Sequence, residues 1–151
     1  MNPQVIYFSQ SGNNKRLAQG IANYYGLSAT PIVPTNPYPN NYHELILRAR
    51  RERFRHLNVP IHPVKLDEKA DTLILVAPIW YADLPRPVIT FLKQLQQPYR
   101  RVIIVSDKYM LGFGICRRTL QKYLPSSTII DLLAANSNDF STVITTLNWN
   151  K

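Results

Sequence analysis

Five short apolar, β-prone runs alternate with five helical patterns along this chain, and that alternation constrains the fold more than any other feature. The runs predict strands at Val5–Phe8, Leu27–Val33, Thr72–Val76, Val102–Val105 and Thr128–Leu133. The segments that follow them predict helices at Asn14–Tyr25, Tyr42–Leu57, Arg86–Leu95, Ile115–Leu124 and Ser141–Trp149. The economical architecture is an α/β fold of three layers, in which helices cover both faces of an open five-stranded parallel sheet. We expect the strand order 2-1-3-4-5.

The segment between the first strand and the first helix has the composition of an anion site. Its candidate hydrogen-bonding side chains are Ser9, Ser11, Asn13 and Asn14. The first N–H groups of a helix have no internal partners and the helix dipole adds positive charge there, so a phosphate suits this position. Gly12 lets the backbone approach such a group closely. The alternative is an ordinary strand–turn–helix connection in which an Asn caps the helix.

Two further loops, Ala77–Pro85 and Ser106–Gly114, leave the carboxyl ends of strands. In this strand order a ligand binds beyond those ends, so a planar cofactor with a phosphate tail could touch all three loops. Trp80 and Tyr81 are costly to leave in water, and they cover either the core or a flat heteroaromatic ring. In the third loop the preferred ring contact is Tyr109, with Met110 as a second candidate and Gly112 at a sharp turn.

The first two loops together resemble the FMN-binding loops of flavodoxins. Tyr7–Asn14 is similar to their Ser/Thr-x-Ser/Thr-Gly-Asn-Thr phosphate loop, with Asn14 in place of the final Thr. Ala77–Tyr81 and the helix after it resemble the second FMN loop of a bacterial flavodoxin-like family, many of whose members carry Pro-Ile-Trp-Trp there. The segment Pro37–Glu52 is similar to that family's inserted segment. The resemblance extends from about Val5 to Leu133.

This resemblance implies a flavodoxin-like protein that binds FMN and acts in electron transfer or as a small FMN-dependent oxidoreductase, with no catalytic side chain. The phosphate would contact Ser9, Ser11, Gly12, Asn13 and Asn14. The isoalloxazine would meet Pro78, Ile79, Trp80, Tyr81 and Ala82, together with Tyr109 and Gly112. The alternative is a flavodoxin-fold binding module that has lost FMN and uses a basic surface to bind an acidic protein or nucleic acid.

The charge balance predicts attraction to acidic partners. Lys and Arg total 18 against 9 Asp and Glu, which gives a formal charge of +9. The apolar residues of the predicted second helix fall roughly on one stripe: Tyr42, Leu45, Ile46, Ala49 and Leu57. The other face is strongly basic and carries Arg48, Arg50, Arg51, Arg53 and Arg55. That face is either simply solvated or docks an acidic partner, such as a redox protein. Nucleic acid is less favoured because no nucleic-acid-binding motif is present.

Length and composition bound the remaining possibilities. The 151 residues suggest one domain, 1–151. No apolar run approaches a membrane span, and the N-terminus lacks a signal pattern, so a soluble cytoplasmic protein without a membrane partner is expected. A single cysteine, Cys116, excludes an internal disulfide and a multi-cysteine metal site. The three histidines have no metal-site spacing.

Overall fold

The computed structural model describes residues 1–107 and 112–149 of the chain. Its helices and strands alternate as the sequence predicts. They are β1 (Pro3–Tyr7), α1 (Asn13–Tyr24), β2 (Thr30–Pro31), α2 (Tyr42–Phe54), β3 (Thr72–Val76), α3 (Arg86–Gln94), β4 (Arg101–Asp107), α4 (Cys116–Tyr123), β5 (Ile129–Ala135) and α5 (Ser141–Trp149).

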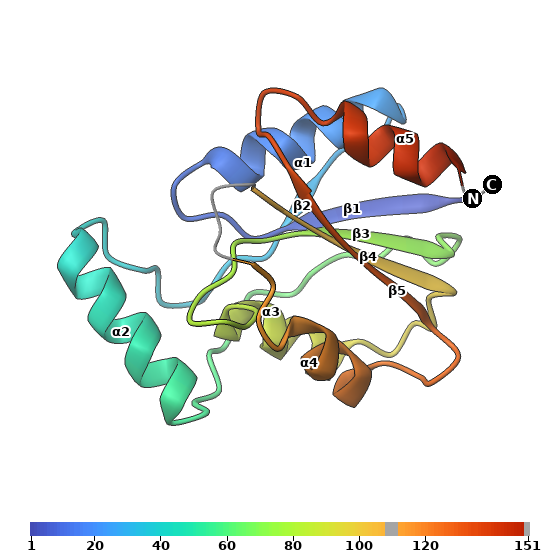
Figure 1. Ribbon diagram of the computed structural model, residues 1–151. Coiled ribbons are helices and arrows are strands. Elements are labelled where there is room, and N and C mark those ends of the chain that lie inside the picture. The colour runs from blue at the N-terminus through green and yellow to red at the C-terminus, as the bar shows by residue number, and fades with distance from the viewer. Residues whose placement is uncertain (108–111, 150–151) are drawn as a thin grey trace.

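The five strands form one parallel sheet in the order β2-β1-β3-β4-β5, which confirms the predicted order. Helices α1 and α5 cover one face of the sheet, and α3 and α4 cover the other (Figure 1). All five residues of β3 are buried, because a central parallel strand contacts helices on both sides. The carboxyl ends of the strands therefore share one edge of the sheet, which we call the C-terminal edge.

The second strand is shorter than its predicted span of Leu27–Val33. Only Thr30 and Pro31 pair with β1, at the outer side of the sheet. Proline has no N–H to donate, and it is tolerated at this sheet edge because the next residue, Ile32, donates its N–H to the Tyr7 carbonyl of β1 at 2.7 Å. The predicted edge position of this strand is confirmed.

Helix α2 lies outside the two helical layers, beside the C-terminal edge (Figure 1). Asn41 caps its start by accepting a hydrogen bond from the Glu44 N–H at 3.1 Å. The predicted apolar stripe along this helix is only partly present: Ala49 is buried, but Tyr42 is 75% exposed. The other buried residue of the helix is the charged Glu52, so α2 is held by polar contacts more than by an apolar face.

Nothing in the described part of the chain would serve as a membrane helix, because no helix there is both long and apolar enough.

Candidate functional site

Three loops meet at the C-terminal edge of the sheet, as the strand order predicts. The Asp107 N–H, at the end of β4, donates to Asn14 Oδ1 in the first turn of α1 at 3.2 Å. The Ile115 N–H, before α4, donates to the Ala82 carbonyl at 2.7 Å. Short contacts thus connect the loop after β4 to both of the other loops.

The start of α1 has no side-chain cap. Gly12 occupies the N-cap position with φ of 93°, a left-handed conformation that glycine adopts without strain. The alternative expectation, in which an Asn caps this helix, is therefore wrong. A Cβ at Gly12 would meet no described residue within 4 Å, and the first turn contains no acidic residue. The helix begins with backbone N–H groups that the helix itself cannot satisfy.

Three side chains of the first loop use their oxygen atoms as acceptors. Ser9 Oγ accepts the Gly12 N–H at 3.1 Å, and the buried Asn14 accepts the Asp107 N–H. Asn13 Oδ1 accepts from Arg16 Nη2 at 2.6 Å. Among the contacts of the described residues, the Ser9 hydroxyl and both Asn side-chain NH₂ groups make no hydrogen bond as donors. Ser11 is exposed.

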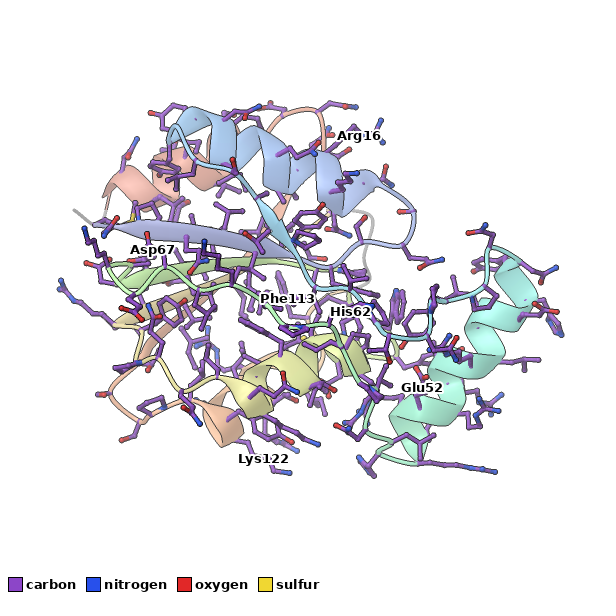
Figure 2. The ribbon with its side chains drawn as sticks, turned by 180° about the vertical axis from the view of Figure 1, so that it is seen from behind. Arg16, Glu52, His62, Asp67, Phe113 and Lys122 are labelled. Atoms are coloured by element: carbon purple, nitrogen blue, oxygen red, sulfur yellow. The ribbon has the colours of Figure 1, made fainter. Side chains whose placement is uncertain are left out.

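Sequence reasoning missed Arg16 as part of this loop, although its spacing of three residues from Asn13 on a helix is a recognisable signal. Arg16 is exposed at the loop end of α1 (Figure 2). Its guanidinium adds a positive charge beside the helix start, where the helix dipole already favours anions.

Trp80 belongs to a group of three aromatic rings at the same edge, which we call the aromatic cluster: Phe8, Tyr38 and Trp80. The Trp80 ring packs edge-on against Phe8 and against Tyr38, with centroids 5.3 Å apart in each pair. Tyr38 and Phe8 are buried, whereas Trp80 is partly exposed. The cluster connects the first and second loops to the inserted segment before α2, and Tyr38 was not among the predicted site residues.

Tyr81 has different neighbours from Trp80. Its ring packs edge-on against Phe54 of α2 at 5.9 Å, and its hydroxyl donates to the Ile46 carbonyl at 3.4 Å. The two adjacent rings therefore do not form a single wall: Trp80 lies in the aromatic cluster, and Tyr81 lies against α2. The stacking of either ring on a cofactor stays a prediction.

A charged network holds the aromatic cluster in place. Glu52 accepts hydrogen bonds from the Tyr38 hydroxyl and from Arg48 Nε at 2.9 Å. The Arg48 guanidinium lies 3.9 Å from the centre of the Tyr38 ring. Glu52 is buried on the side of α2 that faces the body of the protein (Figure 2). Burial, and then the hydrogen bond to Glu52, raises the pKa of Tyr38, so its hydroxyl stays a donor at physiological pH.

The second loop is held in an unusual backbone conformation. Tyr81 and Ala82 have φ of 53° and 63°, values that non-glycine residues seldom adopt. The buried Asp83 fixes the following residues by accepting from the Leu84 N–H at 2.8 Å and the Thr119 hydroxyl at 2.7 Å. A Cβ at Gly114 would lie 2.1 Å from the Ala82 carbonyl oxygen, so only glycine allows α4 to approach this loop.

The other predicted contacts lie along the same edge. Pro78 and Ile79 are partly buried, Ala82 is exposed, and Gly112 is exposed with φ of 104°. Tyr109 and Met110 fall outside the described residues. The structure therefore brings the predicted first and second loops together, and the predicted ring contacts of the third loop remain untested except for the position of Gly112.

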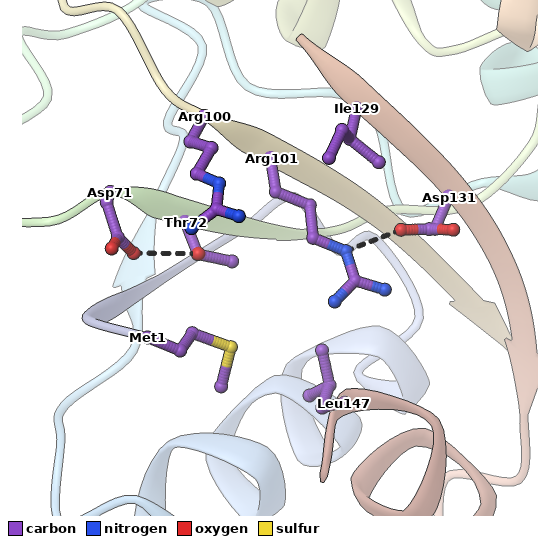
Figure 3. Close-up of a pocket in the computed structure, with 8 residues that line it drawn as sticks. All are labelled: Met1, Asp71, Thr72, Arg100, Arg101, Ile129, Asp131 and Leu147. Atoms are coloured by element: carbon purple, nitrogen blue, oxygen red, sulfur yellow. Dashed lines mark hydrogen bonds and ion pairs between the residues drawn. The ribbon is translucent and has the colours of Figure 1, made fainter. Parts of the chain in front are cut away.

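A cavity of about 580 Å³ lies at the opposite edge, where the strands begin (Figure 3). Its carboxylates already have partners: Asp131 pairs with Arg101 at 2.6 Å, and Asp71 accepts from the Asn2 N–H and the Thr72 hydroxyl, each at 2.8 Å. These hydrogen bonds hold the pKa of Asp71 below its ordinary value. Within the described ranges, His, Cys, Asp and Glu form no group of three or more that could hold a metal ion.

No family model matches the chain, and no curated protein matches it. Solved structures do. A candidate flavoprotein from Bacteroides uniformis superposes with a TM-score of 0.78 at 21% identity, covering 97% of each chain. One from Bacteroides eggerthii gives 0.77 at 20% identity, covering 97% of this chain and 98% of that one. A flavoprotein from Lactobacillus acidophilus, crystallised in complex with FMN, gives 0.76 at 15% identity and 99% of both chains. The predicted flavodoxin-like fold is confirmed.

Proposed function

We propose that this flavodoxin-like chain binds FMN at the C-terminal edge of its sheet and acts in electron transfer or as a small FMN-dependent oxidoreductase. The observation that carries the proposal is the first loop. No side chain caps the helix start there, and Ser9, Asn13 and Asn14 use their oxygen atoms as acceptors in the described contacts, so that their O–H and N–H groups could donate to an anion. The complex of the Lactobacillus acidophilus neighbour with FMN supports the choice of cofactor.

The donors of the first loop suit a phosphate monoester. The first backbone N–H groups of α1, the hydroxyls of Ser9 and Ser11 and the NH₂ group of Asn13 are the donors we assign to it. Lys15 and Arg16 are exposed in the first turn of α1 and add positive charge nearby. The open space at Gly12 lets an oxygen approach the backbone without meeting a side chain.

The second loop suits the flat ring system. We assign ring contact to Pro78–Ala82, with the partly exposed Trp80 as the main aromatic surface. Phe8 and Tyr38 brace the indole on its buried side and exclude water from it. Bound FMN would supply the redox chemistry, while these residues bind the cofactor and set its surroundings.

An absorbance spectrum tests the proposal directly. The purified protein, or the protein after incubation with FMN and gel filtration, should be yellow with the bands of bound flavin. Titration of FMN fluorescence with the protein then gives the dissociation constant. A colourless protein that takes up no added FMN would contradict the proposal and favour a flavodoxin-fold binding module.

A double variant tests the placement of the phosphate. Ser11→Ala with Asn13→Ala removes two donors to a charged group, each worth about 1.5 kcal/mol or more, so FMN affinity should fall roughly 100-fold or more. The matched control is Ser126→Ala with Ser127→Ala, two exposed residues before β5 at the opposite edge, which should leave the affinity unchanged. Unchanged affinity in the first pair would show that the phosphate binds elsewhere.

A further inference from the structure

The four arginines of α2 and its C-cap residue Arg55 divide into two groups with different neighbours. Arg48 bonds Glu52 and donates to the Pro37 carbonyl at 2.8 Å, and Arg53 lies 3.9 Å from Asp83. Both side chains face the body of the protein. Arg50, Arg51 and Arg55 are exposed, and among the described contacts their side chains form no hydrogen bond or ion pair. Among the described contacts, these three positive charges are therefore not paired with a carboxylate of the protein.

Two large apolar side chains lie among those three arginines. Leu47 is 53% exposed and Phe54 is 60% exposed. Together with Arg50, Arg51 and Arg55 they line a shallow groove of about 380 Å³ on the outer side of α2, which we call the α2 groove. Exposed apolar groups rimmed by charges are typical of an interaction surface.

The α2 groove is joined to the loop that we assign to the flavin ring. Phe54, in the groove, packs against Tyr81, and the Tyr81 hydroxyl bonds the Ile46 carbonyl of the same helix. Figure 1 shows α2 beside the edge where the strands end. A protein seated in the groove would therefore lie next to the second loop.

We propose that the α2 groove docks an acidic partner protein, which presents carboxylates around an apolar side chain. The carboxylates would pair with Arg50, Arg51 and Arg55, and the apolar side chain would contact Leu47 and Phe54. That this partner exchanges electrons with the chain rests on the proposed function; the docking itself does not.

Charge and apolar content select this occupant over two others. A second copy of the chain would bring the same three arginines toward each other across a symmetric interface, which like charges oppose. A nucleic acid would satisfy the arginines, but an aliphatic side chain such as Leu47 suits a protein anchor better than a phosphate backbone.

The experiment measures binding of an acidic plant-type [2Fe–2S] ferredoxin by titration calorimetry at low ionic strength. Two charge-reversal variants differ only in location. One is Arg50→Glu, Arg51→Glu, Arg55→Glu in the groove. The other changes three exposed lysines near the opposite edge: Lys69→Glu, Lys93→Glu, Lys122→Glu. Both alter the net charge by the same amount, so a difference between them reports the surface and not the total charge.

We expect the groove variant to lose affinity on the order of tenfold or more, and the matched variant about threefold or less. Leu47→Ala with Phe54→Ala should weaken binding several-fold without a change of charge. Equal losses in the two charge variants, or no binding by the unaltered chain, would overturn the proposal. So would tighter binding of a short single-stranded oligonucleotide at the same arginines.

Each titration is repeated with and without added FMN. Ferredoxin binding that depends on the groove in a chain that takes up no FMN would support the docking surface and refute the proposed function. FMN uptake by a chain whose ferredoxin binding does not depend on the groove would support the proposed function and refute the docking surface.

Discussion

The two edges of the sheet differ in what their polar groups do. At the edge where the strands begin, a cavity of about 580 Å³ is lined by carboxylates that are already paired with Arg101, Asn2 and Thr72. At the C-terminal edge, no described side chain caps the helix start, and the loop side chains Ser9 and Asn13 make no described hydrogen bond as donors. Unused hydrogen-bonding capacity, and not empty volume, is the reason why we propose the ligand site at the C-terminal edge.

The largest difference between the two edges should be in the loss of stability when a glycine with positive φ is replaced by alanine. Gly114→Ala places a methyl group 2.1 Å from the Ala82 carbonyl oxygen and forces a positive φ on alanine, so we expect a loss of about 3 kcal/mol or more in the free energy of unfolding. The matched change is Gly26→Ala, at the other end of α1, where φ is 68° and nothing lies within 4 Å. It should cost about 1 kcal/mol.

Urea unfolding followed by circular dichroism measures both glycine variants. Similar losses at the two positions would show that the contact between the second loop and α4 is not tight.

The next largest difference should be in the stability lost when a paired carboxylate is replaced by its amide. Glu52→Gln removes the charge that balances the partly buried Arg48 and weakens the anchor of Tyr38, so about 2 kcal/mol should be lost. Asp131→Asn at the opposite edge breaks a pair whose carboxylate side chain is 31% exposed, and it should cost less than about 1 kcal/mol. A larger loss for Asp131→Asn than for Glu52→Gln, measured by the same unfolding assay, would contradict the view that the pair at the C-terminal edge contributes more to stability.

Near neutral pH, titration of side chains should change stability least, and the pH dependence should have opposite sign at the two edges. The pKa of Asp71 is lowered, so the stability it contributes is present above its ordinary value and is lost as pH falls below that value. Burial, and then the charge of Asp83, raises the pKa of Cys116 from 9.0 to about 12, so its contribution is complete below pH 9.0 and is lost as pH rises toward 12.

Two variants test whether Asp71 and Cys116 cause the loss of stability at low pH and at high pH, respectively. Asp71→Asn should flatten the acid limb of the stability profile alone, and Cys116→Ala should flatten part of the alkaline limb alone. The folded protein should also resist thiol reagents at neutral pH, since Cys116 is fully buried and protonated. Rapid labelling of the folded chain would contradict this account.

The sequence predicted most of the fold because its signals are local. The apolar runs of β3 and β4 and the periodicity of α1 and α3 mark elements whose partners need not be known. The strand order was expected because five strands with an anion loop after the first fit the order 2-1-3-4-5, and right-handed crossovers limit the alternatives. The failures occurred where tertiary contacts decide. The second strand is limited to Thr30 and Pro31, and α2 buries the charged Glu52 in addition to Ala49 of the expected apolar stripe.

The candidate site was predicted as three loops but not as a set of contacts. Tyr38, Arg48 and Glu52 lie between the first two loops in the chain, and no local pattern connects them to Trp80. The Asn14 bond to Asp107 spans 93 positions in the chain, so no local spacing rule could find it.

By itself, the sequence determined the order of strands and helices, the parallel sheet and the edge where the three loops meet, because these depend on short-range periodicity and chain connectivity. Only the tertiary structure decided which polar groups are used up and which remain available. The absence of a cap on α1, the separation of Trp80 from Tyr81 and the division of the α2 arginines all depend on neighbours distant in the sequence. A hydrogen bond or an ion pair is a property of two groups, and the chain brings the second group near only when it folds.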